Sequence, residues 1–262
     1  MQHRGVLKAL ALGGVTLGLA WPQVVCAGAW SQPRGHALAI LKYEPVWSIH
    51  GFDEDGDRVS LPYERVDHVV SIWGEYGLTE DVTLLLKSDW QDADDGVRAF
   101  RGVGPTEIGA RWQFLTRGTS VASVQATYVT DSDGRNAAWG APGQGAQEAD
   151  FRLMAGHTFV GAKPKFVELQ VARRWRENLD TETRIEAAAG MHLGTRYTMM
   201  AQLYAGQADA DDGHVGARWI TAEVSSIRHW DNWSAQVGWR STVAGRKVNA
   251  GDGPIVALWR RF

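Results

Sequence analysis

The chain has 262 residues, of which 27 are Lys or Arg and 30 are Asp or Glu, so its formal net charge is −3. A mildly acidic chain lacks the basic face that nucleic-acid binding needs, so we expect no nucleic-acid partner. The only cysteine is Cys26, which excludes a disulfide-stapled scaffold and a cysteine metal site.

The first part of the chain, 1–29, has the three parts of a secretory signal peptide: basic residues, the apolar run 9–21 and small residues ending at Ala29. The run is shorter than the ~20 residues that span a bilayer, which disfavours an uncleaved anchor. A lipoprotein signal would have a small residue before the cysteine that is lipidated. Val25 precedes Cys26, which disfavours a lipoprotein. We therefore predict cleavage near Ala29 and a single domain over 30–262.

Runs of alternating polar and apolar residues follow, separated in turn by short turns and longer polar loops. Alternation with period two predicts β-strands with one apolar face, and its recurrence is typical of a transmembrane β-barrel. The twelve predicted strands are 36–47, 65–76, 82–90, 107–115, 121–130, 150–159, 166–176, 184–193, 197–206, 217–227, 233–242 and 254–262.

The predicted fold class is all-β: a single antiparallel transmembrane β-barrel of about 12 strands, with short periplasmic turns and longer acidic extracellular loops. The alternative is a soluble sandwich in which the apolar face of each strand is the core. The acidic loops include 53–57, 92–96, 131–134 and 209–213. Aspartate oxygens suit Ca²⁺, but the EF-hand spacing is missing, so we predict solvated turns and no metal.

The alternation also predicts which charged side chains face the lumen. The two signs balance there, with eight basic and eight acidic residues on the lumen face. The basic set is Lys42, Lys87, Arg111, Arg152, Arg174, Arg176, Arg184 and Arg240, and the acidic set is Glu44, Glu75, Asp89, Glu107, Asp150, Glu168, Glu186 and Glu223. The lumen-lining site candidates among them are Arg111, Arg152, Glu168, Arg174, Arg176, Arg184, Glu186, Glu223 and Arg240.

Charges inside a barrel must be paired or hydrated, because burial of a single charge is costly. One interpretation is therefore a salt-bridge network that fills a narrow barrel. The other is a polar channel in which Arg174, Arg176, Arg184 and Arg240 form a basic track for an anionic solute, since the planar guanidinium binds carboxylates with two hydrogen bonds.

Three segments resemble known families. The stretch 75–84, EYGLTEDVTL, resembles a hairpin of small Gram-negative barrel proteins, including outer-membrane transporters of the MetA pathway of phenol degradation. The segments 29–35 and 52–56 resemble exported XagA-type proteins associated with extracellular-polysaccharide genes. Phe262 resembles the terminal signal read by the barrel-assembly machinery, although Arg260 stands where that signal has an aromatic or apolar residue.

These resemblances imply location in the bacterial outer membrane after signal cleavage, with membrane lipid, lipopolysaccharide and the barrel-assembly machinery as partners. The expected function is a narrow channel or surface component for small polar or anionic solutes or extracellular polysaccharide. A closed structural or adhesive barrel, and an enzyme acting on lipid or lipopolysaccharide, are the alternatives. No G-x-S-x-G motif is present, so we predict no catalytic residue. We also expect no cofactor.

Overall fold

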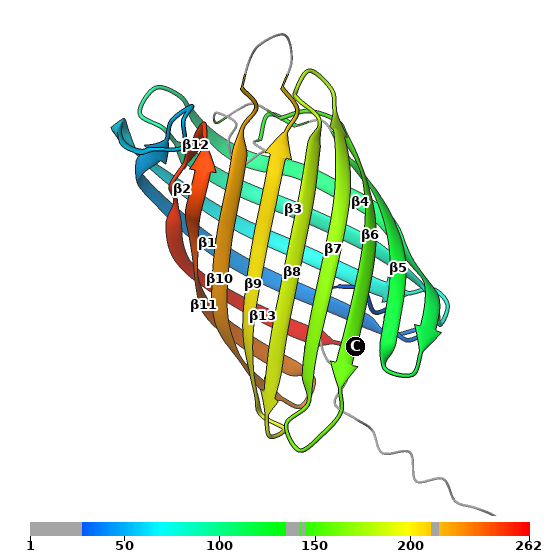
Figure 1. Ribbon diagram of the computed structural model, residues 1–262. Coiled ribbons are helices and arrows are strands. Elements are labelled where there is room, and N and C mark those ends of the chain that lie inside the picture. Colours follow the sequence, from blue (N-terminus) through cyan, green and yellow to red (C-terminus); the bar gives the residue numbers. More distant parts are fainter. Residues whose placement is uncertain (1–27, 131, 135–141, 143–144, 211–214) are drawn as a thin grey trace, which may run out of the picture.

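The computed structural model describes residues 28–130, 132–134, 142, 145–210 and 215–262. Within these residues the strands form one antiparallel sheet that closes into a barrel, because β1 pairs with both β2 and β13 (Figure 1). The strands are β1 Ala37–Phe52, β2 Arg58–Gly77, β3 Val82–Asp94, β4 Ala99–Arg117, β5 Ser120–Val129, β6 Glu148–Phe159, β7 Lys165–Arg176, β8 Glu182–Leu193, β9 Tyr197–Ala208, β10 Arg218–Trp230, β11 Trp233–Arg246, β12 Val248–Asn249 and β13 Asp252–Arg261.

Twelve of these strands make the barrel wall, which confirms the predicted fold and strand number. The extra element is β12, whose two residues pair with Gly51 and Phe52 at the end of β1. No helix among the described residues is long and apolar enough to cross a membrane.

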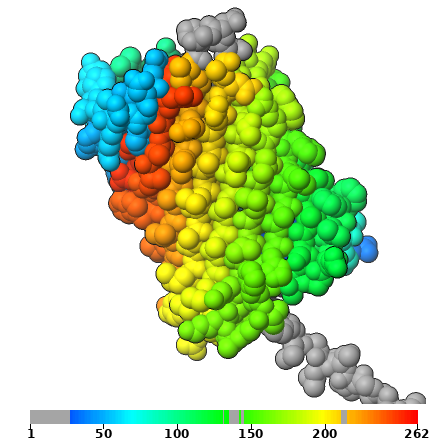
Figure 2. Space-filling view, in the orientation of Figure 1, coloured from blue at the N-terminus to red at the C-terminus, as the bar shows by residue number. Residues whose placement is uncertain are grey.

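The barrel has its apolar face outside. On β7 the side chain of Leu169 is 51% exposed, whereas its neighbour Glu168 is 6% exposed and points inward. The same alternation recurs around the wall, and the outer surface of β7 to β11 is continuous in Figure 2. A soluble sandwich would bury the apolar face, so this distribution fits a wall that meets lipid.

Outward aromatic side chains lie at two levels, as expected for the girdles of a membrane barrel. The lower level lies near the short turns and the upper level near the longer loops. The exposed members are Tyr76, Phe114, Phe159, Tyr197 and Phe262 at the first level, and Trp90, Tyr128, Trp175 and Trp239 at the second. Three other tryptophans, Trp73, Trp219 and Trp259, point into the barrel instead.

The two ends of the barrel differ. Short turns join β2 to β3, β4 to β5, β6 to β7, β8 to β9 and β10 to β11 at one end, which we call the short-turn end. Gly194 and Asp231 have positive φ angles of 68° and 48°, as such tight turns require. Both ends of the wall also meet there, since Ala37 and Phe262 exchange two backbone hydrogen bonds of 3.2 and 2.9 Å. The other end is the long-loop end.

Several strands extend further toward the long-loop end than predicted. The strand β2 begins at Arg58 rather than at 65, and β4 begins at Ala99 rather than at 107. Pro62 and Pro105 argue against strand structure in these extensions, but backbone pairing continues, as between His50 and Ser60. The predicted loop 92–96 is likewise partly strand, because β3 runs to Asp94.

The acidic loops behave as turns where the structure describes them. The Asp53 carboxylate accepts hydrogen bonds from the backbone N–H groups of Asp55, Gly56 and Asp57 at 2.9 to 3.0 Å, so it is used to hold its own loop. Of the predicted loops 131–134 and 209–213, residues 131 and 211–213 lie outside the described residues. In the described part of the chain, no group of three or more His, Cys, Asp or Glu side chains could hold a metal ion.

Candidate functional site

The candidate site is a cavity of about 500 Å³ inside the barrel. Every strand of the wall contributes a side chain to its lining, because period two points alternate residues of each strand inward. The charged members are Lys42, Glu44, Lys87, Asp89, Glu107, Arg111, Asp150, Arg152, Glu168, Arg174, Arg184, Glu186, Glu223 and Arg240. Seven of these are basic and seven are acidic, so the formal charge of the lining is balanced.

Arg174 is the centre of an ion-pair network on the long-loop side of the cavity. Its guanidinium lies 2.7 Å from Glu148 and 3.2 Å from Asp150, on neighbouring β6, and 3.9 Å from Glu107. The register of the sheet causes this, since Arg174 is directly opposite Asp150. Buried charges that are satisfied in this way hold the wall rigid, and they are costly to separate.

The network continues along β7 and β8 toward the long-loop end. Arg176 pairs with Glu148 at 3.2 Å and with Glu182, and Arg184 pairs with Glu182 at 2.5 Å. The side chain of Arg184 also lies over the ring of Trp219, 5.9 Å from its centroid. Arg176 is fully buried among these groups and does not line the cavity.

A second cluster lies across the cavity. Arg240 on β11 bridges Glu44 on β1 and Glu223 on β10, at 2.5 and 2.6 Å, and packs over the ring of Tyr204 at 4.8 Å. On the facing wall Arg152 contacts Glu186 at 2.8 Å. Each guanidinium is therefore held at a fixed place on the wall rather than free in the lumen.

The nine predicted candidate residues all point inward, but they differ in what they contact. Those that line the cavity are Arg111, Arg152, Glu168, Arg174, Arg184, Glu186, Glu223 and Arg240. Arg176 is part of the ion network only. Sequence reasoning missed Glu148 and Glu182, although each stands two residues before a predicted lumen charge on the same strand, a spacing that would have revealed them.

Although the formal charges balance, the accessible charge is mainly positive. The side chains of Lys42, Arg240 and Lys87 are 29%, 27% and 26% exposed. Their partners Glu44, Glu107 and Asp89 are 13%, 14% and 8% exposed. Among the lining carboxylates Glu186 is the exception, at 22%. A solute in the cavity therefore meets cations in front of carboxylates.

The floor of the cavity, at the short-turn end, is apolar. Inward side chains from five strands form one buried cluster there, with Trp30 and Trp73 packed against it; its members are Leu38, Ile40, Phe166, Met200, Ile227, Ala257 and Trp259. Gly190 makes room for Phe166, since a Cβ at that position would collide with the ring. Hydrated solutes cannot pass through such packing without a change in it.

The segment 28–34 completes this floor and was not predicted to lie inside the barrel. Its backbone is anchored to the wall: the N–H of Ala29 donates to Glu168 at 3.0 Å, and that of Gln32 donates to Thr83 at 2.8 Å. Trp30 packs edge-on against Phe166, with ring centroids 6.4 Å apart. This stretch, which we call the N-terminal segment, occupies part of the lumen at the short-turn end.

Part of the N-terminal segment belongs to the predicted signal peptide, since Ala29 is its last residue. The cleavage site itself remains a prediction, because residues 1–27 lie outside the described part of the chain.

Two serine–histidine contacts bear on the enzyme alternative. Ser120 lies 2.7 Å from His157 on the outer wall, and Ser234 lies 2.8 Å from His229 inside the short-turn end. Ser234 is completely buried, so a substrate cannot reach it. Neither histidine forms an ion pair with a carboxylate of the described residues, so the orienting acid of a catalytic triad is missing from both contacts.

Solved outer-membrane barrels share this fold. The COG4313 outer membrane channel from Pseudomonas putida F1 is 14% identical, with a TM-score of 0.72, and the match covers 92% of this chain and 100% of that one. The KdgM porin, solved in complex with disordered oligogalacturonate, is 12% identical with a TM-score of 0.54, covering 86% and 99%. The NanC porin is 6% identical with a TM-score of 0.55, covering 85% and 98%.

At such low identities the likeness establishes the fold, that of an outer-membrane β-barrel. No family model and no curated protein matches the chain. Membership of the XagA-type or MetA-pathway families therefore remains a prediction from the short segments that resemble them.

Proposed function

We propose that this chain is an outer-membrane channel for small anionic polar solutes, closed at its short-turn end by the N-terminal segment. The observation that carries the proposal is the accessible positive charge of the cavity, where Lys42, Lys87 and Arg240 project in front of their carboxylate partners. Cations that line a narrow lumen attract anions and repel cations.

The similar structures support this proposal without identifying the solute. One is described as an outer membrane channel and two as porins, and one of the porins was solved with oligogalacturonate. We assign the short-turn end to the periplasm and the long-loop end to the cell surface, the usual asymmetry of these barrels. Lipopolysaccharide would then surround the long-loop end. Assembly through Phe262 and a role with extracellular polysaccharide remain predictions.

The proposal is tested by the ion selectivity of the refolded protein in a planar bilayer under a KCl gradient. The wild-type current, which flows when the packing at the short-turn end opens, is expected to be carried mainly by anions. Replacement Lys87→Gln removes an accessible cation and leaves Asp89 without its pairing ammonium, which lies 3.2 Å away. The reversal potential of this variant should therefore move toward that of a cation-selective pore.

Lys247→Gln is the matched control, because Lys247 lies at the long-loop end, 3.6 Å from Glu54 and away from the cavity lining. Its reversal potential should equal that of the wild type. A cation-selective wild type, or a Lys87→Gln variant that behaves as the control does, would contradict the proposal. A barrel that folds but conducts no current even when the N-terminal segment is altered would favour the closed structural barrel.

A further inference from the structure

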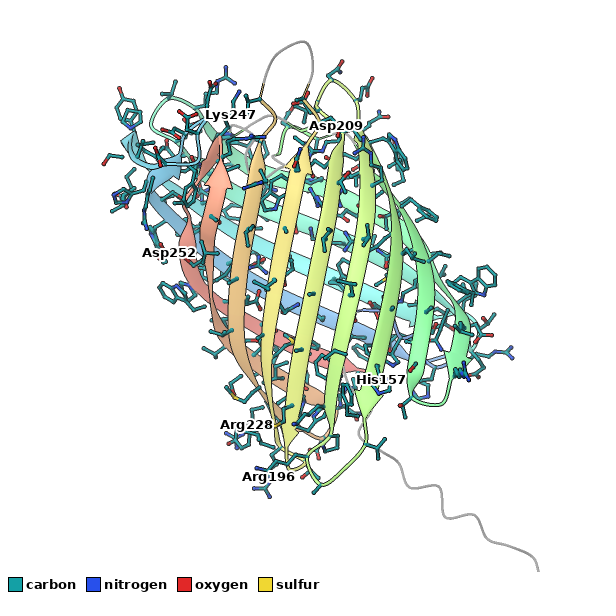
Figure 3. All side chains as sticks on the ribbon, in the orientation of Figure 1. His157, Arg196, Asp209, Arg228, Lys247 and Asp252 are labelled. Atoms are coloured by element: carbon teal, nitrogen blue, oxygen red, sulfur yellow. The ribbon has the colours of Figure 1, made fainter. Side chains whose placement is uncertain are left out.

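Two arginines lie on the lipid-facing surface at the short-turn end. The outward residues of β10 are Ile220, Ala222, Val224 and Ser226, and the next is Arg228. On β13 the outward residues Val256 and Leu258 are followed by Arg260. Figure 3 shows Arg228, with Arg196 of the β8–β9 turn, at the opposite end of the barrel from Lys247 and Asp209.

The register places the two arginines close together. Arg228 is opposite Ala235 of β11, and Arg260 is opposite Trp233 of the same strand. Two strand spacings and an offset of two residues along β11 separate their backbones, which is ~12 Å. The Arg260 guanidinium lies over the ring of Trp233 at 4.6 Å and near that of Phe262 at 5.4 Å, so the aromatic level holds it flat against the wall.

These arginines differ from others in the barrel. Each lumen arginine of the ion network lies within 4 Å of a carboxylate. Two outward arginines near the long-loop end are also paired, Arg101 with Asp92 and Arg173 with Asp209. Within the described residues, no ion pair involves Arg196, Arg228 or Arg260, although Asp231 lies in the same recess as Arg196 and Arg228.

An unpaired guanidinium beside a lipid-facing belt is placed to bind an anion of the membrane. A charge on the lipid face of a barrel costs about 2–4 kcal/mol at the midplane but little near the interface, so these arginines are tolerated where headgroups lie. Phosphate oxygens match the planar fork of arginine. The pair is surrounded by exposed apolar side chains, those of Tyr197, Leu258 and Phe262. These would contact the acyl chains of a phospholipid, whereas a free phosphate ion has no acyl chains.

We propose that Arg228 and Arg260, assisted by Arg196, bind the phosphate of an anionic phospholipid in the leaflet that meets the short turns. This site lies on the outer wall, outside the channel. It rests on the proposed function only in that the barrel must lie in a membrane. It also gives a role to Arg260, which departs from the aromatic or apolar residue usual in the terminal assembly signal.

The test is native mass spectrometry, which counts the lipid molecules that stay bound to the protein. The full refolded protein is incubated with phosphatidylglycerol or with phosphatidylcholine and is then released from detergent. The wild type should retain phosphatidylglycerol in preference to phosphatidylcholine. The double variant Arg228→Gln/Arg260→Gln should lose this preference, with several-fold less bound phosphatidylglycerol. Arg228→Lys/Arg260→Lys should keep part of it, because lysine retains the charge but not the two-pronged geometry.

Arg101→Gln, on the outer wall near the other end, is the control and should bind lipid as the wild type does. Heat-modifiable migration on a gel verifies that each variant folds. If the loss of Arg260 prevents assembly, Arg196→Gln/Arg228→Gln is tested in place of the first double variant. Equal phosphatidylglycerol binding by variant and wild type would overturn the proposal, as would binding of inorganic phosphate without lipid preference. Ion selectivity should be unchanged in these variants, so failure here is distinct from failure of the channel.

Discussion

Replacement of Trp30 and Gln32 together by alanine is expected to raise the single-channel conductance of the folded barrel several-fold. Trp30 packs against Phe166 at the floor of the cavity, and Gln32 donates a hydrogen bond to Glu75 at 2.7 Å. The double change removes the largest side chain of the N-terminal segment and one of its attachments to the wall. Single-channel recording in planar bilayers measures the result directly.

Trp112→Ala is the matched control for this prediction. Trp112 also lies near the short-turn end, but its side chain is exposed on the outer wall. This change should leave the conductance as it is in the wild type. A folded Trp30→Ala/Gln32→Ala barrel with wild-type conductance would show that the N-terminal segment does not close the lumen.

Replacement of Glu75 by glutamine is expected to destabilise the barrel by roughly 3–5 kcal/mol, the cost of leaving a buried charge without its partner. Glu75 and Arg111 form a two-pronged ion pair, with N–O distances of 3.0 and 3.2 Å and side chains 0% and 1% exposed. Glutamine preserves the shape of the side chain but leaves the Arg111 guanidinium uncompensated. Denaturant unfolding of the protein in lipid vesicles measures the change in free energy.

The paired change Glu75→Leu/Arg111→Met should recover most of the lost stability, because it removes both charges from the buried site. Glu54→Gln is the control, since Glu54 is largely exposed and its contact with Lys247 is an open surface pair. That variant should unfold within about 1 kcal/mol of the wild type. If Glu75→Gln were as stable as this control, the pair would have no structural role.

The barrel wall could be predicted because alternation is a local signal. On β7 the polar residues at 168, 170, 174 and 176 lie an even number of residues apart, as do the charges at 184 and 186 on β8, so the pattern already separates lumen from lipid. Strand ends were less predictable. The stretch 58–64 also alternates, but Pro62 within it argues against a strand, and the extension forms because β1 offers a pairing partner for 58–60.

The N-terminal segment could not be predicted, because its position depends on contacts distant in sequence. Ala29 contacts Glu168, which is 139 residues away, and no periodicity in 28–34 indicates this. The sign of the charge that is accessible in the cavity could not be predicted from the sequence either. Parity places Lys87 and Asp89 on the same face, but only packing decides that the ammonium projects further than the carboxylate.

The closure of β1 against β13 has a consequence for biosynthesis. The ribosome makes β1 early, yet β1 obtains its second neighbour only when β13 has been made, more than 200 residues later. Until then the growing sheet has two open edges, which pair readily with other chains. Pairing over such sequence distances is also intrinsically slow. The unfinished chain is therefore more prone to pair with its copies than the closed barrel, in which Phe262 is hydrogen-bonded to Ala37.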